Sequence, residues 1–226
     1  MSDVAIRLAE PAEHDKIGVL IEAAYDHDYE IGDSYRASLR DVETRASEHQ
    51  VWVAVDRDTG QLLGTVATPR PGGHISQLGQ DGELDFRTLA VDPAARRRGI
   101  GRILVEHVIA LAAERGLTRV VLNSGPQMIG AHRLYYAMGF TRLRDRETLI
   151  VEGHTEPLLT FGLELGDGTP VSAPLSVSLS VPRMPRMPRV PRVARVPRGG
   201  RCRSRLRLTC PEPRHRPPGL SPTPSA

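Results

Sequence analysis

Residues Leu84–Leu104, LDFRTLAVDPAARRRGIGRIL, decide how the rest of the chain is interpreted. The stretch begins as an apolar strand and breaks at Asp92 and Pro93. It then passes through three consecutive arginines and a Gly-Ile-Gly step into a helical pattern. The first turn of a helix leaves backbone N–H groups without intrahelical partners, and the peptide dipoles concentrate positive potential there. The sequence therefore predicts an anion-binding site, of the kind that holds phosphate, where this helix begins.

Two common diphosphate-binding motifs do not match this loop. A dinucleotide-binding fingerprint needs G-x-G-x-x-G, but Leu104 stands where the third glycine is required. A Walker loop needs Gly-Lys followed by Ser or Thr, and the stretch lacks it. What remains is R-x-x-G-x-G, from Arg96 to Gly101, directly after the strand. The alternative interpretation of this short pattern is a solvated, arginine-rich helix entry with two chance glycines.

The pattern R-x-x-G-x-G resembles the acetyl-CoA signature of the GNAT N-acetyltransferase superfamily. A second segment, AHRLYYAMGF at Ala131–Phe140, is similar to the family's A-x-x-L-Y-x-x-x-G-F segment. Two motifs at the right separation, with a strand between them, match by chance far less often than either alone. The resemblance covers about residues 4–165. It implies an α/β fold of the mixed, α+β type, as a single domain with a central, mostly antiparallel mixed sheet flanked by helices.

Local patterns predict an order of helices and strands that agrees with this family. A hairpin of Val51–Val55 and Leu62–Thr68 precedes strand Glu83–Val91, which alternates strictly. One face of that strand is expected to carry Leu84, Phe86, Thr88 and Ala90, and the other Glu83, Asp85, Arg87, Leu89 and Val91. The other expected elements are strands at 4–8, 119–123, from 139 and 158–165, and helices at 11–25, 34–46, 100–116 and 128–138.

The charge of the chain divides it into two parts. Residues 166–226 hold 12 Arg against Asp167 and Glu212, a net charge of +10, whereas residues 1–165 hold 18 Lys plus Arg against 25 Asp plus Glu, a net charge of −7. The second part also holds 13 of the 19 prolines, so it cannot build a core and is expected to be a disordered, low-complexity tail. The alternatives for this tail are an accidental extension or a polyanion-binding arm.

Several classes of protein are excluded by what the sequence lacks. No signal peptide opens the chain and no run of 18 apolar residues occurs, so a cytoplasmic protein without membrane contact is expected. Cys202 and Cys210 lie in the tail, which leaves the predicted domain without a thiolate metal site or disulfide. No histidine pair has helical metal-binding spacing, and no metal is expected.

The resemblance implies acetyl-CoA as cosubstrate and assigns the residues that hold it. The pyrophosphate would lie on the loop formed by Arg96, Arg97, Arg98, Gly99, Ile100, Gly101 and Arg102. The pantetheine arm would pair with the backbone of Leu89, Ala90 and Val91, and Asn123 would hydrogen-bond the arm or an ordered water. Backbone N–H groups of the same strand would polarise the thioester carbonyl.

The resemblance also implies two catalytic roles. Tyr135 matches the family tyrosine that protonates the leaving thiolate, because only it has the required spacing to Gly139 and Phe140. The neighbouring Tyr136 is the competing phenol. By position, Asp85 is the first candidate for the general base and Glu83 the second. Both carboxylates have an alternative reading as ordinary strand residues.

The predicted function is transfer of an acetyl group from acetyl-CoA to a primary amine of a small molecule or protein, directly and in a ternary complex. The alternatives are a non-catalytic acyl-CoA-binding regulatory module, or polyanion binding through the tail. The acidic domain favours a cationic acceptor such as a polyamine, an aminoglycoside, or a protein N-terminus or lysine. Segment 25–35, which is rich in tyrosine, either lines the acceptor cleft or is a solvated connector. Nucleic acid is not an expected partner, and a homodimer is left open.

Overall fold

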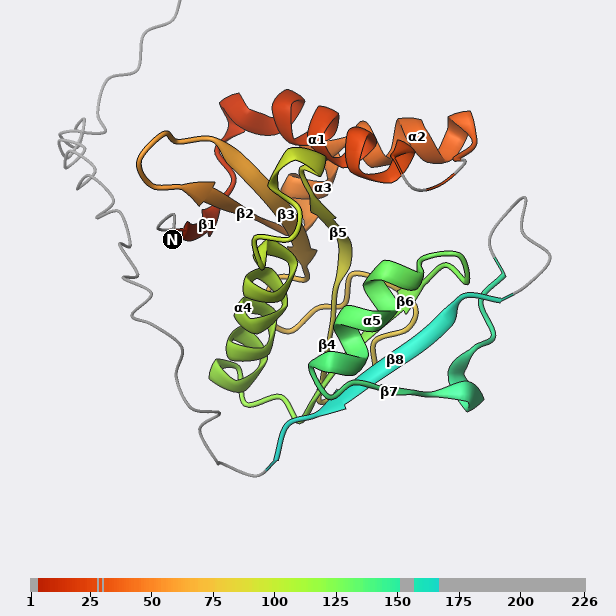
Figure 1. Ribbon diagram of the computed structural model, residues 1–226. Coiled ribbons are helices and arrows are strands. Elements are labelled where there is room, and N and C mark those ends of the chain that lie inside the picture. The colour runs from red at the N-terminus through yellow and green to blue at the C-terminus, as the bar shows by residue number, and fades with distance from the viewer. Residues whose placement is uncertain (1–3, 28, 30, 151–156, 167–226) are drawn as a thin grey trace, which may run out of the picture. The chain divides into compact units, whose positions relative to one another are not determined.

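The computed structural model describes residues 4–27, 29, 31–150 and 157–166, and it has the expected mixed α/β fold class (Figure 1). In chain order, with η for a 3₁₀ helix, the elements are β1 (Val4–Leu8), η1 (Pro11–Glu13), α1 (His14–Asp26), α2 (Asp33–Arg40), α3 (Val42–Glu48), β2 (Gln50–Asp56), β3 (Leu62–Thr68), β4 (Glu83–Asp85), β5 (Arg87–Val91), η2 (Pro93–Ala95), α4 (Ile100–Glu114), β6 (Arg119–Ser124), α5 (Ile129–Ala137), β7 (Thr141–Arg142), η3 (Arg144–Arg146) and β8 (Leu159–Glu164). The predicted tail, apart from Gly166, lies outside the described residues, and the boundary before it stays a prediction.

The strands form two four-stranded sheets, where the sequence predicted one. In the first sheet β1, β2, β3 and β5 lie side by side in that order, and all pairs are antiparallel. In the second sheet the order is β4, β6, β8 and β7, and β4 runs parallel to β6. The strand pairing is mixed and mostly antiparallel, as expected, but the strands are divided between two sheets.

The division falls within the segment that was predicted as one strand, Glu83–Val91. Its first half pairs with β6, as far as a hydrogen bond of 3.2 Å from the Phe86 N–H to the Val121 carbonyl. Its second half pairs with β3. Thr88 is left-handed, with φ of 54°, and the register with β3 changes there, so that β5 carries one extra residue. Such a bulge bends a strand and ends its regular pairing.

The bulge makes the predicted alternation of this segment wrong in its second half. Leu84 and Phe86 belong to the core cluster that includes α4, whereas Ala90 belongs to the cluster beneath α1. Leu89 and Val91 contact the α4 cluster, although they were expected on the opposite face from Leu84. The reason is that one additional residue in a strand turns every later side chain to the other face.

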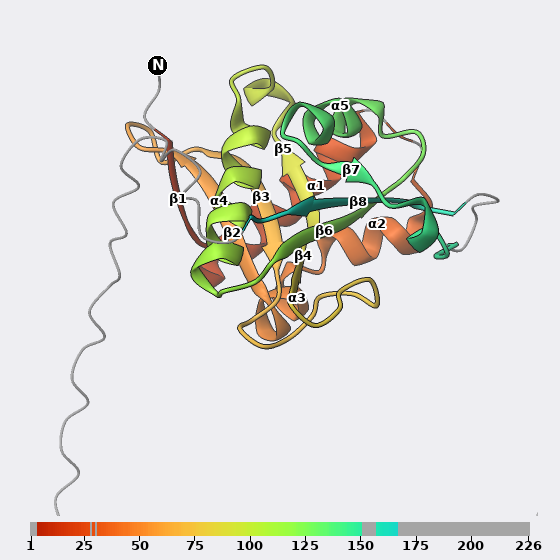
Figure 2. The same cartoon turned by 90° about the horizontal axis from the view of Figure 1, so that it is seen from below.

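Helices cover both faces of the first sheet. Alternate residues of β2 show this: Val53 and Val55 pack in the cluster with α1, and Trp52 and Ala54 pack in the cluster with α4. The two views of the molecule agree that α1 and α4 lie on opposite sides of β3 and β5 (Figures 1 and 2). Within the described residues, no helix has both the length and the apolar character needed to cross a lipid bilayer.

The helix predicted over residues 34–46 is two helices, α2 and α3. They are separated by Asp41, whose ψ of 72° lies outside the helical region. The Asp41 carboxylate accepts a hydrogen bond of 3.1 Å from the Thr44 N–H and so caps α3. Aspartate favours such capping over a place inside a helix, which explains the break.

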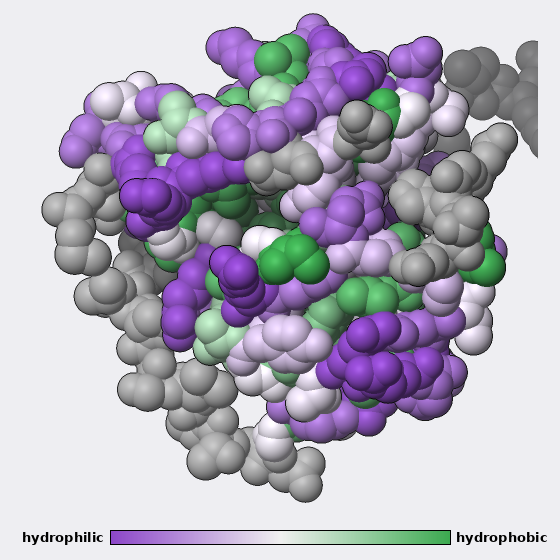
Figure 3. All heavy atoms as spheres, turned by 45° about the vertical axis from the view of Figure 1, so that its right-hand side comes forward, coloured by the Kyte–Doolittle hydropathy of each residue, from purple (hydrophilic) through white to green (hydrophobic). Residues whose placement is uncertain are grey.

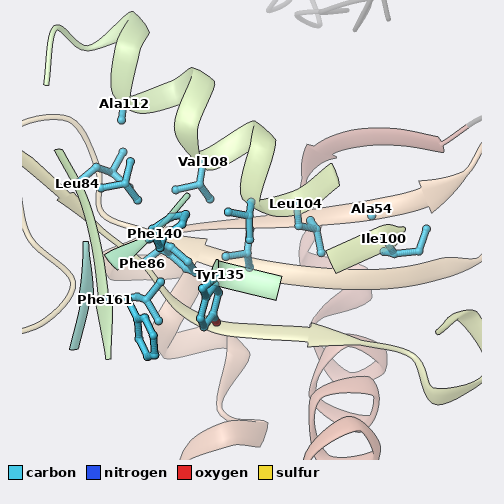
Figure 4. Close-up of a cluster of buried hydrophobic side chains, with 14 of the residues drawn as sticks. Ala54, Leu84, Phe86, Ile100, Leu104, Val108, Ala112, Tyr135, Phe140 and Phe161 are labelled. Atoms are coloured by element: carbon cyan, nitrogen blue, oxygen red, sulfur yellow. The ribbon is translucent and has the colours of Figure 1, made fainter. Parts of the chain in front are cut away.

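Aromatic side chains join the second sheet to α5. The ring centroid of Tyr135 lies 6.3 Å from that of Phe86, 5.8 Å from that of Phe140 and 5.5 Å from that of Phe161. Figure 4 shows these four residues grouped together, with Val108 and Leu104 of α4 nearby. The cluster positions Tyr135 because its ring is enclosed by three others.

Helix α4 lies unusually close to β3 because residue 64 is glycine. A Cβ at Gly64 would lie 2.8 Å from the Ala90 carbonyl oxygen, 3.0 Å from Leu104 Cδ1 and 3.1 Å from Ile100 Cγ2. No side chain fits there without a shift of the strand or the helix. Gly64 therefore sets the position of the N-terminal turn of α4 relative to the sheet.

His107 of α4 is a titratable group inside the core. Its ring packs edge-on against Trp52, at a centroid distance of 4.3 Å, and its buried Nε2 has no hydrogen-bond partner among the described residues. Burial, helped by the positive charge of Arg115, lowers the pKa of His107 from 6.5 to about 4. His107 therefore binds a proton less readily in the folded protein than in the unfolded chain.

We expect the free energy of unfolding to fall by about 3 kcal/mol through this histidine as the pH decreases from about 6.5 toward 4. Neutral His107 makes its full contribution to the free energy of unfolding above the pKa of the unfolded chain. This contribution is lost in acid, because the unfolded state then binds the proton more readily. Denaturant unfolding between pH 7 and 5 should show a shallower loss of stability for His107→Leu than for the wild type. His14→Gln, at the start of α1, is the control. Equal slopes for His107→Leu and the wild type would contradict the assignment.

Candidate active site

Strands β5 and β6 diverge in the middle of the fold (Figure 1), and the predicted cofactor-binding strand residues Leu89–Val91 lie on β5 beyond this point, whereas Glu83 lies at the other end of β4, opposite Arg119. Pairing between the two sheets ends at the hydrogen bond from Phe86 to Val121, and β5 continues to Val91 with β3 on one edge. Its other edge, which carries the backbone of Leu89, Ala90 and Val91, has no strand partner among the described residues. Unpaired N–H and C=O groups of this kind accept an extended ligand as an additional strand.

The loop between β5 and α4 has two residues in the left-handed region. Asp92 begins the loop, and its carboxylate accepts a hydrogen bond of 2.9 Å from the Ala94 N–H. Arg97 and Gly99 are both left-handed, with φ of 60° and 79°. Left-handed residues that alternate with others can turn successive N–H groups toward one anion, and this loop leads directly into the N-terminus of α4.

Gly99 and Gly101 are glycine for different structural reasons. Gly99 needs its positive φ and has open space on the side where a Cβ would point. At Gly101 a Cβ would lie 3.2 Å from Leu134 Cδ2 of α5 and 3.6 Å from Val91 Cγ2 of β5. The first glycine therefore shapes the loop, and the second lets α4 pack against α5. Ile100 between them is buried in the core.

Three of the four arginines between residues 96 and 102 contact protein groups. Arg96 donates a hydrogen bond of 3.0 Å to the Ala24 carbonyl near the end of α1, and its Nη1 lies 3.0 Å from His27 Nδ1. Arg98 lies 3.3 Å from an oxygen of Asp56. Arg102 pairs with Glu106 one turn along α4 at 2.8 Å. Arg96 thus connects the loop to α1, a structural role that its place in the motif does not reveal.

Arg97 is exposed, and no hydrogen bond or ion pair of its side chain is present among the described residues. Its guanidinium is therefore the one of the four that is free to add charge at the mouth of the loop.

Tyr135 and Tyr136 are neighbours in sequence but differ in environment. Tyr135 is 4% exposed, whereas Tyr136 is 54% exposed. Burial, together with the nearby Tyr29, raises the pKa of Tyr135 above its usual value of 10. The Tyr135 phenol therefore keeps its proton at neutral pH.

Asn123 lies near the end of β6, with its side-chain oxygen accepting a hydrogen bond of 2.8 Å from Thr160 Oγ1 of β8.

Asp85, at the end of β4, is 1% exposed and fully engaged with the loop before it. Its carboxylate accepts hydrogen bonds of 3.1 Å and 3.2 Å from the Ile75 N–H and one of 2.7 Å from Ser76 Oγ. His74 Nδ1 lies 3.7 Å away. These contacts fix the path of the loop at residues 74–76.

Glu83 is paired with two arginines. Arg146 and Arg119 lie 2.8 Å and 3.0 Å from its Oε1. Burial alone would raise the pKa of Glu83, but the hydrogen bonds from Arg146 and Arg119 outweigh it and lower the pKa below its usual value. A carboxylate held in this way is a weaker base than a free one.

Sequence reasoning missed the role of His132 at this site. This histidine of α5 is 7% exposed, and its Nε2 lies 3.1 Å from the Gly125 carbonyl and 3.2 Å from Ser124 Oγ. It therefore holds the turn that follows β6, next to Asn123. Its spacing of three residues from Tyr135, which places both side chains on one helix face, was a signal that could have indicated it.

The tyrosines of segment 25–35 come together at the end of α1. The ring of Tyr25 packs edge-on against Tyr29 and Tyr35, with centroid distances of 6.1 Å and 6.2 Å. Tyr25 is 9% exposed and Tyr35 is 41% exposed. His27 reaches Arg96 of the motif loop, and Asp28 lies outside the described residues. Tyr25 is therefore buried within a ring cluster, His27 contacts the motif loop, and Tyr35 is exposed, so the two alternatives for this segment stay open.

Comparisons with known proteins agree with this geometry. The model of the acetyltransferase (GNAT) family matches residues 17–140. A peptidyl-lysine N-acetyltransferase of Salmonella typhimurium is 31% identical over 164 residues, which cover 70% of this chain and 97% of that protein. Glucosamine 6-phosphate N-acetyltransferase 1 of Oryza sativa is 31% identical over 108 residues, 48% of this chain. The chain spans 62% of that rice protein, and 34% and 41% of two further relatives.

Solved structures show the same fold. A putative acetyltransferase of Salmonella typhimurium, whose structure contains its cofactor acetyl-CoA, superimposes with a TM-score of 0.50 at 22% identity. The superposition covers 77% of this chain and 99% of that one. With a family match over more than half of its length and a relative aligned almost end to end, the chain belongs to the GNAT family of acetyltransferases.

Proposed function

We propose that this protein transfers the acetyl group of acetyl-CoA to an amine acceptor, directly and within a ternary complex. The observation that carries the proposal is the opening between β5 and β6. It combines an unpaired strand edge, a loop with left-handed Arg97 and Gly99 at a helix N-terminus, and a buried phenol. Each of these suits one part of the reaction.

The chain offers a fitting site for coenzyme A. Backbone N–H groups from Arg97 to Gly101 would hold the pyrophosphate, with the Arg97 side chain adding charge. The free edge of Leu89–Val91 would pair with the pantetheine arm, and Asn123 of β6 lies on the opposite side of the opening. Bound acetyl-CoA would supply the acetyl group as an activated thioester.

Tyr135 is the proposed general acid. Its phenol carries a proton at neutral pH because burial disfavours the phenolate. The surrounding rings of Phe86, Phe140 and Phe161 orient it. Tyr135 Oη would donate this proton to the sulfur of the leaving thiolate, which is otherwise a poor leaving group in a dry site. Backbone N–H groups of β5 would stabilise the oxyanion that develops on the acetyl carbonyl.

Acetyl transfer to nitrogen is supported by the names of the relatives. The Salmonella relative is named for peptidyl-lysine and the rice relative for glucosamine 6-phosphate, and both acceptors are amines. An amine of a small molecule and an amine of a protein are both candidate acceptors. A cytoplasmic location and the absence of a catalytic metal stay predictions, and a homodimer is left open. Within the described residues, no group of three or more His, Cys, Asp or Glu side chains is arranged to hold a metal ion.

Glycine 99 offers a test of the phosphate loop. We expect Gly99→Glu to weaken CoA binding by at least about 10-fold, because a carboxylate at the N-terminus of α4 competes with the phosphates. Isothermal titration calorimetry with CoA measures this. Gly116→Glu is a matched control at the other end of α4, since Gly116 also has a positive φ, of 68°, and open space around it. Equal affinities in the two variants would contradict the assignment of the loop.

Tyr135→Phe tests the general acid, because it keeps the ring and its packing and removes the hydroxyl. We expect kcat to fall about 10²- to 10⁴-fold while the affinity for CoA is retained, since a proton donor acts in the transition state. Release of free thiol from acetyl-CoA with an amine acceptor measures the rate. Tyr136→Phe, on an exposed side chain of the same helix, should be unaffected. A larger fall in kcat for Tyr136→Phe than for Tyr135→Phe would show that the motif is aligned one residue out of place.

Asp85→Asn separates the two roles open to Asp85. We expect a stability loss of about 1–3 kcal/mol, because the amide group meets buried donors that the carboxylate had satisfied. If Asp85 is also the general base, kcat falls and the acidic limb of the pH–rate profile disappears. Asp81→Asn, on the exposed part of the same loop, is the control. Full kcat in Asp85→Asn, with reduced stability, would leave Asp85 as a loop anchor and remove it as the base.

A further inference from the structure

Ser124, the last residue of β6, lies beyond the point where β5 and β6 diverge. Strand β4 pairs with β6 only as far as Val121, and the rest of β6 keeps β8 on one edge and has no strand on the other among the described residues. Because β6 pairs with β8 without a shift in register, its side chains alternate between the two faces of the sheet. Ser124 therefore lies on the same face as Leu122, which belongs to the core cluster that contains Tyr135.

His132 of α5 contacts Ser124 and the turn that follows it. Its Nε2 lies 3.2 Å from Ser124 Oγ and 3.1 Å from the Gly125 carbonyl oxygen. The imidazole ring also packs on Phe161 of β8, at a centroid distance of 5.2 Å, and Phe161 packs on Tyr135 at 5.5 Å. A continuous series of contacts thus leads from the end of β6 to the proposed general acid.

The hydrogen bonds at this turn decide which nitrogen of His132 carries a hydrogen. A carbonyl oxygen can only accept, so Nε2 must donate to the Gly125 carbonyl. Burial lowers the pKa of His132, although the hydrogen bond to the Gly125 carbonyl acts in the opposite direction, and the ring is neutral at neutral pH. The Nε2–H is shared between the Gly125 carbonyl and Ser124 Oγ, which makes the Ser124 oxygen an acceptor toward His132.

The hydroxyl hydrogen of Ser124 has no acceptor at this turn. A carbonyl oxygen has two lone pairs, and that of Gly125 accepts from the Met128 N–H at 3.0 Å as well as from His132. In the part of the chain that the structure describes, Ser124 Oγ makes no other hydrogen bond. Ser124 is 4% exposed, and buried polar groups are normally hydrogen-bonded. Its free hydrogen is therefore available to a ligand in the opening.

We propose that Ser124, oriented by His132, donates a hydrogen bond to a carbonyl oxygen of acetyl-CoA in the opening between β5 and β6. The inference rests on the proposed acetyl transfer and adds two residues to which the motifs assign no role. The arm of acetyl-CoA carries amide carbonyls and, at its end, the thioester carbonyl, and a hydroxyl hydrogen suits either kind. Contact with the thioester oxygen would make Ser124 a catalytic residue that stabilises the developing oxyanion. His132 is a positioning residue in either case.

The surroundings favour such a hydrogen bond. Phe161 is fully buried, and Ser124 and His132 are buried beside it, so water competes little for the hydroxyl hydrogen. A hydrogen bond in surroundings of low polarity is stronger than one in water. In the view of Figure 3, hydrophobic atoms show in a hollow beneath a ridge of hydrophilic residues, so the surface also offers apolar contacts to a bound ligand.

Binding of two probes to the full chain tests the donor. Ser124→Ala should weaken the binding of acetyl-CoA about 3- to 10-fold, which is the effect of one neutral hydrogen bond. The same loss with CoA, which lacks the thioester, would identify an amide oxygen as the acceptor, whereas a loss with acetyl-CoA alone would identify the thioester oxygen. Thr65→Val is the control, because this buried hydroxyl donates to the Trp52 carbonyl and the variant should keep both affinities. Isothermal titration calorimetry measures each dissociation constant.

His132→Phe tests the orientation of Ser124, because it keeps a ring against Phe161 and removes the Nε2–H. The Ser124 hydroxyl can then donate to the Gly125 carbonyl, so the affinity for acetyl-CoA should fall by a similar factor, and the double variant should lose nothing further. Unchanged affinity of Ser124→Ala for both probes would overturn the inference, as would losses that multiply in the double variant. The Ser124→Ala result decides alone if His132→Phe does not fold. Failure of the wild type to bind either probe would overturn the proposed function, and the inference with it.

Discussion

The structure depends on one departure from regular strand pairing. The segment from Glu83 to Val91 begins in one sheet and ends in another, with the bulge at Thr88 between. A strand that stayed paired along its whole length would have no free edge for a ligand. Because β5 leaves β6 after Phe86, an opening forms in the middle of the fold, where main-chain groups and buried side chains both reach it. The proposed binding of acetyl-CoA depends on this local irregularity.

Close packing around the opening keeps its parts in place. Gly64 allows α4 to approach β3, and Gly101 allows the same helix to approach α5 and β5. Arg96 joins the motif loop to the end of α1, where the tyrosine cluster lies. The motif loop and the end of α1 are therefore joined through Arg96.

Charge at the site is arranged locally and does not follow the composition of the chain. Both carboxylates of β4 are engaged, Asp85 by the loop and Glu83 by two arginines. Buried charges are compensated by particular neighbours, so the net charge of a domain carries little information about the potential within a cleft.

The amino-acid sequence by itself determined the elements and the family. Hydrophobic periodicity located nearly every helix and strand, because the 3.6- and 2-residue repeats depend on local geometry alone. The two motifs, from Arg96 to Gly101 and from Ala131 to Phe140, indicated the phosphate loop and Tyr135, since such spacing reflects a fixed backbone shape. Only the tertiary structure decided the split of Glu83–Val91, the engagement of Asp85 and the positions of Arg96 and His132. These features arise from contacts between residues distant in sequence, such as Arg96 with Ala24, and a bulge is set by the strands on either side of it, so no local pattern contains them.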